Sequence, residues 1–426
     1  MDAFEKVVGY EPIKEELLQI CDMIHNKEAY ETLGAKFPNG ILLYGDPGLG
    51  KTLMAKCFIE ESGLKAYTVR RNKSNDDFIG NITYTFEKAK ANPPCIVFLD
   101  DIDKFANEDD ERRDAEEYVA VQAGIDEVKD CGVFVLATAN NIDKLPDSLV
   151  RSGRFDRKIE VESPNDEDAG KIIEHYLADK KVSKDVGMED LSRMISYSSC
   201  AELETILNEA AIYAAYKRKS SIEMEDLIKA VLKMNYESSD FSVKISDEEI
   251  KKIALHEAGH LVVAEALCPG CVGFASLRST GRNSHGGFVH LCKELTRRPY
   301  HVLIALASKA AVELYYADTA ASGCQSDIDH AYRLIRDGIS ENATLGFGLV
   351  DITTHNFSEP SDALTARSEA VTQAELEHYM LKARDILLKN RDFLEKTAAA
   401  LAEKETLLYS DIRKIKESTV VTEVAI

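Results

Sequence analysis

The octapeptide GDPGLGKT, from Gly45 to Thr52, constrains the fold more than any other stretch of this chain. It matches the pattern G-x-x-x-x-G-K-[ST], follows the apolar run ILLYG and precedes the amphipathic run TLMAKCFIEESG. A strand, a glycine-rich turn and a helix in this order form a phosphate-binding loop, which makes a chance glycine-rich turn the weaker interpretation. Backbone N–H groups of such a loop surround a β-phosphate, Lys51 neutralises phosphate oxygens and Thr52 offers a hydroxyl to Mg²⁺. The residues predicted to hold a nucleotide here are Gly45, Asp46, Pro47, Gly48, Leu49, Gly50, Lys51 and Thr52.

Strand-like runs alternate with amphipathic runs from the start of the chain to about residue 162. ILLYG (41–45), AYTVRR (66–71), CIVFLD (95–100) and VFVLATAN (133–140) are short, apolar and partly β-branched. This alternation is typical of a parallel α/β sheet that is covered by helices on both faces. We therefore expect a nucleotide-binding α/β domain over residues 1–162.

Helical periodicity replaces the alternation beyond that point. Residues 163–235 contain runs such as AELETILNEAAIYAAYKRK, which predict a small helical lid domain. Residues 236–245 are expected to be a linker, and 246–415 a mainly α-helical domain with one short strand in a Gly- and Ser-rich stretch. The last residues, 416–426, have no periodicity and are expected to form a flexible tail.

Polar residues end the predicted strands. Asp100 ends an apolar run, where a carboxylate can hold Mg²⁺ through water, and Asp101 follows in the place for a residue that polarises the attacking water. Asn140 closes the next strand. The segment RSGRFDR then presents arginines that can reach a neighbour's γ-phosphate if the domain forms a ring.

A second motif, HEAGH at residues 256–260, lies on a strongly helical run. In H-E-x-x-H the imidazoles of His256 and His260 lie one turn apart on one helix face, within reach of one Zn²⁺. Glu257 is placed to take a proton from a zinc-bound water and pass it to a leaving amine. Two such histidines can be ordinary core residues, but the glutamate in register favours a zinc peptidase. Gly259 is expected to let another backbone pass close to this helix.

The residues alone leave the third zinc ligand open. The position six residues after the second histidine is alanine, and no Asp or Glu lies between Glu265 and Glu294 to complete a thermolysin-like site. Spacing does not exclude His285 or His290. Far downstream, Asp327 opens another helical run after a polar turn.

Composition limits the classes of partner and compartment. The net charge of −22 disfavours nonspecific binding to nucleic acid or anionic membranes. No apolar run approaches the roughly 18 residues of a membrane span, and the start of the chain has no signal-peptide pattern. The nine cysteines are expected to be reduced thiols, and the CPGC pair is interpreted as incidental. These features predict a cytoplasmic protein with no nucleic-acid partner and no intrinsic membrane segment.

Residues 1–235 resemble an AAA+ ATPase domain with its helical lid. FEKVVGYEPIKEEL resembles the opening segment of that family, and SSCAELETILNEAAIYAA resembles the lid helix of its FtsH branch. The resemblance implies a homohexamer with ATP between subunits, an adenine that lies beside Val8 and Gly9, and Arg154 and Arg157 acting on the neighbour's ATP.

Some residues depart from the family pattern. Asp46 stands where the family usually has Pro, Leu49 where it has Thr or a small residue, and Asp101 where it has Glu. Asp is shorter than Glu by about 1.5 Å, and a misplacement of that size lowers a rate by on the order of a hundredfold. We therefore expect ATP binding with slow hydrolysis. Phe78 stands at the position of the family's substrate-gripping pore-loop aromatic, or else it is a core residue.

The rest of the chain resembles the FtsH peptidase domain. The segment ASGCQSDIDHA implies Asp327 as the third zinc ligand, with Asp329 and His330 as weaker rivals. HGGFVHL resembles the edge strand that binds an extended peptide by β-augmentation. Ala307 and Ser308 replace two glycines of the family, a change expected to tighten packing without touching a ligand.

The resemblance covers nearly all 426 residues and implies an ATP-dependent zinc endopeptidase that unfolds and degrades proteins, with Zn²⁺, ATP and Mg²⁺ as cofactors. FtsH proteins normally begin with membrane-spanning helices, whereas this sequence begins at the ATPase. We therefore expect a soluble variant, or one that a partner recruits to membranes as an adaptor. Two alternatives stay open. One is an ATP-independent zinc peptidase for unstructured chains, and the other is a nucleotide-gated remodelling or scaffold ring with impaired ATP hydrolysis.

Overall fold

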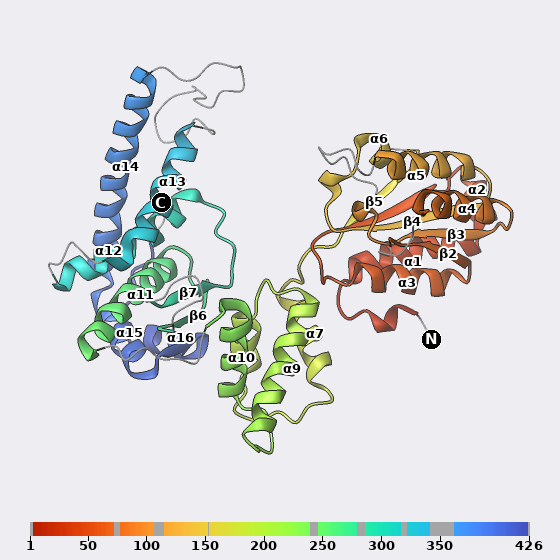
Figure 1. The fold of residues 1–426 in the computed structure, drawn as a ribbon. Helices are drawn as coiled ribbons and strands as arrows, with labels where there is room; N and C mark the ends of the chain where they lie inside the picture. The colour runs from red at the N-terminus through yellow and green to blue at the C-terminus, as the bar shows by residue number, and fades with distance from the viewer. Residues whose placement is uncertain are drawn as a thin grey trace. The chain divides into compact units, whose positions relative to one another are not determined.

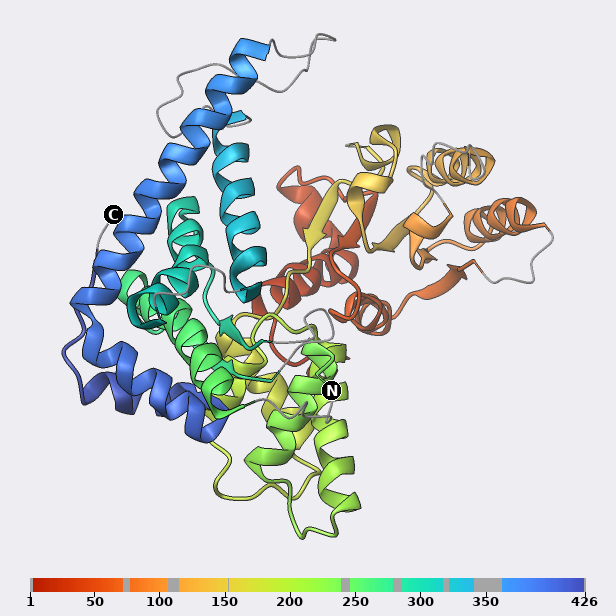
Figure 2. The same ribbon diagram turned by 60° about the vertical axis from the view of Figure 1, so that its left-hand side comes forward.

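The computed structural model describes residues 3–71, 77–105, 115–151, 153–238, 246–278, 286–316, 322–340 and 362–424 (Figures 1 and 2). Their contacts group the residues into two compact units, Met1–Lys180 with Tyr197–Asn208, and Lys181–Ser196 with Glu209–Ile426. No helix within these described ranges is both long enough and apolar enough to cross a membrane.

The first unit is built on a five-stranded parallel sheet with the strand order β2-β3-β4-β1-β5. Every residue of the β3 strand is buried, because helices cover both faces and leave no polar side. The predicted parallel α/β fold is therefore confirmed. The strands are β1 (Gly40–Tyr44), β2 (Lys65–Val69), β3 (Cys95–Leu99), β4 (Val133–Ala139) and β5 (Arg157–Glu160).

Helices lie on both faces of this sheet. Figure 1 shows α4 and α5 on one face and α1 and α3 on the other. The helix α3 begins at Lys51, directly after the glycine-rich loop, so the loop connects β1 to a helix N-terminus as predicted. The helical elements are η1 (Ala3–Lys6), α1 (Glu11–His25), α2 (Lys27–Thr32), α3 (Lys51–Ser62), α4 (Phe78–Lys90), η2 (Ile102–Lys104), α5 (Ala115–Val128), η3 (Ile142–Lys144), α6 (Asp147–Val150) and α7 (Asp166–Leu177).

The region predicted as a lid, 163–235, is helical. Besides α7 it contains α8 (Met188–Met194), α9 (Cys200–Tyr216) and α10 (Met224–Tyr236). The first half of α9 belongs to the first unit, whereas α8, the rest of α9 and α10 belong to the second. The proposed domain boundaries therefore stay predictions.

The second unit is mainly helical and is organised around α11 (Asp247–Leu267). Ser246 caps this helix by accepting a hydrogen bond from the Glu249 N–H group. The second half of α11 is almost completely buried, and it packs against α12 and α15. The other helices of this unit are α12 (Arg298–Tyr316), η4 (Ser322–Cys324), α13 (Gln325–Ser340), α14 (Asp362–Lys389), α15 (Arg391–Lys404) and α16 (Tyr409–Glu417).

A small antiparallel sheet completes the second unit. Its strands are β6 (Val272–Ser276), β7 (Phe288–Leu291) and β8 (Thr406–Leu408), in the order β7-β6-β8. The β7 strand contains the FVHL segment predicted as an edge strand, and it lies at the edge of this sheet. The β8 strand interrupts a stretch that we expected to be helical.

Candidate metal and nucleotide sites

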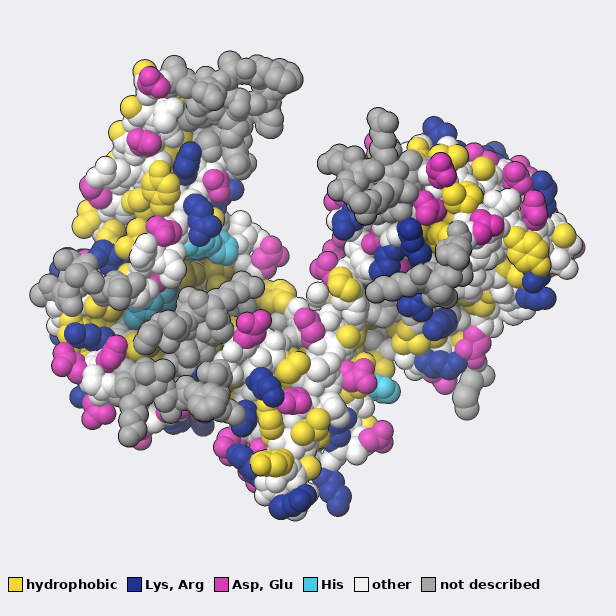
Figure 3. Space-filling view, viewed as in Figure 1, with side chains coloured by type: hydrophobic (Ala, Val, Ile, Leu, Met, Phe, Trp, Pro, Cys, Tyr) yellow, Lys and Arg dark blue, Asp and Glu magenta, His cyan; other side chains and the backbone are white. Residues whose placement is uncertain are grey.

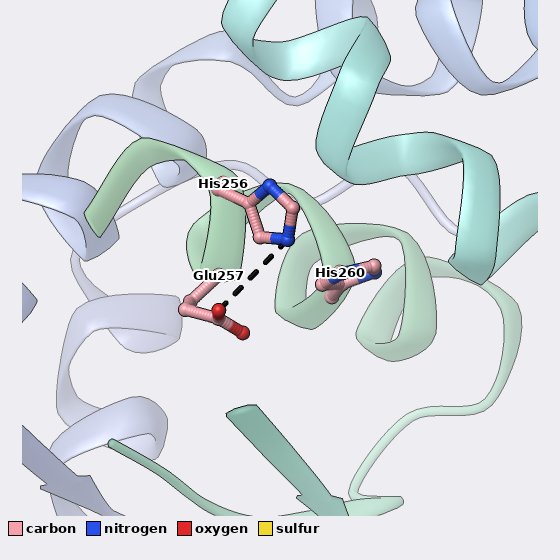
Figure 4. Close-up of side chains that lie close together, drawn as sticks. All are labelled: His256, Glu257 and His260. Atoms are coloured by element: carbon pink, nitrogen blue, oxygen red, sulfur yellow. Dashed lines mark ion pairs between the residues drawn. The ribbon is translucent and has the colours of Figure 1, made fainter. Parts of the chain in front are cut away.

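The helix α11 presents the predicted histidine pair and glutamate together. Figure 4 shows the imidazoles of His256 and His260 on one side of the helix, with the Glu257 carboxylate beside them. Donor atoms of the three residues all lie within 4.8 Å of one another. The His256 Nε2 atom is 3.9 Å from Glu257 Oε1. One turn of α11 therefore places two imidazole rings and a carboxylate close together, as the motif predicts.

Asp327, from the first turn of α13, lies between the two imidazoles. Its Oδ2 atom is 3.2 Å from His256 Nε2 and 3.3 Å from His260 Nε2. Ligand atoms around a tetrahedral Zn²⁺ are separated by about 3.3 Å, as follows from bonds of roughly 2.0–2.2 Å. Two imidazole nitrogens and a carboxylate oxygen are also a ligand set that suits zinc. The residues present therefore fit this metal.

The contacts between Asp327 and the two histidines shift the pKa values of Asp327 and His256 in opposite directions. Burial alone would raise the pKa of Asp327, but the hydrogen bonds to the two histidines hold it well below its usual range. Burial alone would lower the pKa of His256, whereas the contacts with Asp327 and Cys324 raise it to about 10. The carboxylate thus stays ionised in a largely buried position.

Each of these three side chains has an outer partner. The Nδ1 atom of His260 is 2.7 Å from the Ile304 carbonyl oxygen, which can only accept, so Nδ1 carries the proton and Nε2 faces the site. The Nδ1 atom of His256 is 3.6 Å from the Cys324 thiol. Ser308 Oγ donates to Asp327 Oδ2 at 2.8 Å. The expectation that Ser308 touches no ligand candidate is therefore wrong, because its hydroxyl points toward α13.

Glu257 is buried, and its carboxylate is held by the backbone. Burial raises its pKa, and the Gly287 N–H group donates a hydrogen bond to it. A Cβ atom at Gly287 would lie 2.3 Å from the Ser276 carbonyl oxygen and 2.7 Å from Glu257 Cγ. Only glycine allows this close approach. Gly287 belongs to the HGGFVHL segment and directly precedes β7, but its contact with Glu257 has no signal in the sequence.

Gly259 has the role predicted for it. A Cβ atom there would lie 2.7 Å from the Ala307 carbonyl oxygen and 2.8 Å from Ala311 Cβ. The α12 backbone therefore passes close to α11 at the level of the histidines, which confirms the expectation of a close approach.

A cavity of about 880 Å³ opens on these residues. Figure 3 shows histidine side chains beside a hollow in this unit. Residues of the edge strand β7 form one wall, and residues of α12 and α13 form others. The cavity is lined among others by His256, Glu257, His260, Gly287, Phe288, Val289, Ile304, Val312, Cys324, Asp327, Asp329 and His330.

The rival ligands are placed differently. His290 Nδ1 lies 2.7 Å from the Tyr236 hydroxyl and its Nε2 atom 2.8 Å from Ser196 Oγ, so both ring nitrogens are engaged away from α11. Asp329 and His330 line the cavity, but the carboxylate between the imidazoles belongs to Asp327. His285 lies outside the described residues.

The glycine-rich loop borders a second cavity, of about 460 Å³, in the first unit. Thr52 Oγ1 lies 3.0 Å from Asp100 Oδ1, so the two predicted Mg²⁺-binding groups lie together. Thr138 Oγ1, which was not predicted, lies 3.0 Å from the same oxygen. Lys51 Nζ donates to the loop carbonyls of Gly45 at 2.7 Å and Asp46 at 2.6 Å. The predicted residues that line this cavity are Val8, Pro47, Gly48, Leu49, Gly50, Lys51, Thr52, Asp101 and Asn140.

Other wall residues of this cavity were missed from sequence. Ile172, His175 and Tyr176 come from α7, and Cys200 and Ala201 begin α9. Neither the residue types nor their spacing match a motif that would predict nucleotide binding. Gly9 lies between Val8 and Tyr10, and both of these residues line the cavity.

Asp101 has an unusual setting for a residue expected to polarise water. Its backbone has a φ of 57° in the left-handed region. Its Oδ2 atom is 2.6 Å from Lys104 Nζ, and Lys104 also lines the nucleotide cavity. The carboxylate that should face the attacking water is therefore engaged by an ammonium group of its own chain.

The two arginines expected to act on a neighbour's ATP differ in exposure. Arg154 is buried and makes two bonds to Asp126, Nε–Oδ1 at 2.9 Å and Nη2–Oδ2 at 2.7 Å, as well as a bond to the Ser148 carbonyl. Arg157 is exposed and lies 3.7 Å from Glu16. Within this chain the Arg154 guanidinium is thus turned inward, unlike that of Arg157.

Phe78 is a core residue. Its side chain is 7% exposed and meets the Phe105 ring edge-on, with 5.2 Å between the ring centroids. A side chain that grips a substrate must be accessible to it. The assignment of Phe78 as a pore-loop aromatic is therefore corrected in favour of the core interpretation.

The sequence of this chain is similar to a known ATPase family and to several metalloproteases. Residues 41–163 match the ATPase family associated with various cellular activities (AAA). The whole chain is similar to the ATP-dependent zinc metalloprotease FtsH of Leptotrichia buccalis, with 32% identity over 97% of this chain and 56% of that protein. It is also similar to FtsH of Caldicellulosiruptor bescii and FtsH 3 of Symbiobacterium thermophilum, each with 31% identity over 97% of this chain and 71% of the relative.

The chain thus spans between 56% and 71% of the length of these relatives. The matched region covers 97% of this chain and therefore extends over both units. The chain belongs to the FtsH family of ATP-dependent zinc metalloproteases.

Proposed function

We propose that this protein is an ATP-dependent zinc endopeptidase that unfolds and degrades protein substrates. The observation that carries the proposal is the convergence of His256 Nε2, His260 Nε2 and Asp327 Oδ2 beside the buried Glu257. His256, His260 and Asp327 would hold zinc. When bound there, zinc supplies a Lewis acid that lowers the pKa of a bound water and polarises the scissile carbonyl.

Glu257 is the proposed general base and acid. Burial favours its protonated form, and the Gly287 N–H group holds its carboxylate in one orientation. The carboxylate takes a proton from the attacking water and later gives it to the leaving amine. An extended peptide would pair with β7, which lies at the edge of the sheet in the described part of the chain and forms one wall of the cavity. Backbone pairing of this kind selects for unfolded chains more than for particular side chains.

In the first unit, Lys51 and Thr52 would bind the phosphates and Mg²⁺ of ATP together with Asp100. Asp101 would polarise the attacking water slowly, because it is short and is paired with Lys104. We propose a homohexamer that couples ATP turnover to delivery of substrate, with an adaptor as a further partner. All nine cysteines are free thiols, which supports a reducing compartment such as the cytoplasm.

Cleavage of an unfolded substrate such as casein tests the zinc peptidase. The full chain loaded with zinc is expected to cleave it, and Glu257→Gln is expected to abolish cleavage while zinc stays bound. Glu248→Gln, an exposed position on the same helix, is the matched control and should cleave normally. Equal cleavage by Glu257→Gln would contradict the proposed role of Glu257.

A further inference from the structure

Ser308 is fully buried, and its side chain contacts Asp327, one of the proposed zinc ligands. It lies on α12, is 0% exposed, and its Oγ atom is 2.8 Å from Asp327 Oδ2. The same hydroxyl is 3.2 Å from the Ala305 carbonyl oxygen. A serine hydroxyl has only one proton, and the ionised carboxylate is the nearer and stronger acceptor. The hydroxyl proton therefore lies toward Asp327.

The helix that carries Ser308 also contacts a second proposed ligand, His260. Ile304, one helical turn earlier on α12, offers its carbonyl oxygen to His260 Nδ1 at 2.7 Å. Residues four apart lie on one face of a helix. One face of α12 thus supplies the outer partners of both His260 and Asp327.

Asp327 needs such a partner more than the histidines do. The two histidines lie on the long, buried α11 helix, whereas Asp327 belongs to the first turn of α13 and its side chain is partly exposed. A carboxylate in that setting can rotate away from the imidazoles, because its helix position fixes the Cα atom but not the oxygens. A hydrogen bond to a buried hydroxyl on a different helix restricts that rotation.

We propose that Ser308 is a positioning residue of the metal centre, which holds the Asp327 carboxylate in the orientation that completes the zinc site. This inference rests on the proposed zinc site and adds a determinant of its affinity. Glycine or alanine at this position could not make the bond, because neither has a hydroxyl group. Outer partners of metal ligands commonly change metal affinity by about 10- to 100-fold when they are removed.

The test is zinc affinity, measured on the full chain by competition with a chromogenic chelator. Ser308→Ala and Ser308→Gly are expected to bind zinc about tenfold more weakly than the unchanged protein. Ser308→Thr keeps the hydroxyl and should keep most of the affinity. Ser368→Ala, a buried serine on α14, is the matched control and should bind zinc normally.

The outcomes separate this inference from the proposed function. If the unchanged protein binds no zinc, the proposed function fails and this inference fails with it. If the unchanged protein binds zinc and both Ser308→Ala and Ser308→Gly bind it equally well, only the role of Ser308 is overturned. If Ser308 only stabilised the fold, its substitution would lower the urea midpoint of the metal-free protein but leave the zinc affinity of the folded protein unchanged. That result would also overturn the proposed role of Ser308.

Discussion

The Oδ2 atom of Asp327 lies 3.2 Å from the Nε2 atom of His256, although the two residues belong to different helices. Asp327→Asn keeps the shape of the side chain but removes its charge. We expect zinc content after dialysis, and casein cleavage, to fall by about tenfold or more, because a neutral amide is a weaker ligand. Elemental analysis of the dialysed protein measures the first quantity.

Asp329→Asn is the control for that experiment. Asp329 lines the same cavity but does not lie between the imidazoles. If Asp329→Asn lost zinc and Asp327→Asn retained it, the assignment of the third ligand would be reversed.

Gly287→Ala tests how Glu257 is held. The added methyl group would lie 2.7 Å from Glu257 Cγ and must displace either the carboxylate or β7. A displacement of about 1 Å lowers kcat by on the order of a hundredfold. Zinc content should stay unchanged, because the nearest contacts of the added methyl group are Ser276 and Glu257, which are not proposed ligands. Gly323→Ala is the matched control, since Gly323 also lines the cavity and a Cβ atom there meets nothing within 4 Å. Equal kcat for both variants would show that Gly287 does not position Glu257.

Asp101 and Lys104 are expected to keep ATP hydrolysis slow. Asp101→Glu restores the longer side chain, and Lys104→Ala removes the ammonium group 2.6 Å from the carboxylate. Both changes should raise the steady-state rate of phosphate release, by up to on the order of a hundredfold for the first. Lys27→Ala, which removes a comparable exposed ion pair with Glu31, should leave the rate unchanged. No gain from either variant would refute this explanation of a slow ATPase.

His290 makes stability depend on pH. Burial lowers its pKa from 6.5 to about 4, and Tyr236, Ser196 and Arg193 surround it. Between these two pH values the unfolded chain binds a proton that the folded chain excludes, so the free energy of unfolding falls as pH falls from 6.5 to 4. The full effect is about 3 kcal/mol. The contribution of neutral His290 to the free energy of unfolding is complete above pH 6.5 and is lost as the pH falls from 6.5 to 4.

His290→Gln removes this titration. The variant should be less stable than the unchanged protein at neutral pH, and the difference should shrink as the pH falls toward 4. Urea unfolding of the two proteins at several pH values measures the difference, in which the titration of all other groups cancels. Parallel stability curves would exclude His290 as the cause.

Local patterns predicted the parts of both sites that one element supplies. The glycine-rich loop depends on a strand, a turn and a helix that are consecutive in sequence, and the α11 motif depends on helical spacing alone. Neither motif needs knowledge of the rest of the fold, so the sequence alone could place Lys51 and Thr52 at the start of one helix and His256 and His260 on one face of another.

Contacts between distant elements could not be predicted in the same way. Spacing left His285, His290 and Asp327 open as the third ligand, and the packing of α13 and β7 separates Asp327 from His290. Ser308 looked like a packing substitution because nothing in its neighbourhood indicates that its hydroxyl reaches another helix. The sequence left both the pore-loop and the core interpretation of Phe78 open, because its burial depends on Phe105 across the core. The short β8 strand pairs with β6 inside an otherwise helical stretch.

The most direct test of the account is degradation of a folded and an unfolded substrate by the full chain, with ATP, with a non-hydrolysable analogue and without nucleotide. A fluorescent protein that carries an unstructured tail serves as the folded substrate, and casein as the unfolded one. We predict that the folded substrate is lost only with ATP, and that Lys51→Ala and Glu257→Gln each prevent this loss. Cleavage of casein that is equal under all three conditions, with the folded substrate always intact, would contradict the coupling and leave an ATP-independent zinc peptidase.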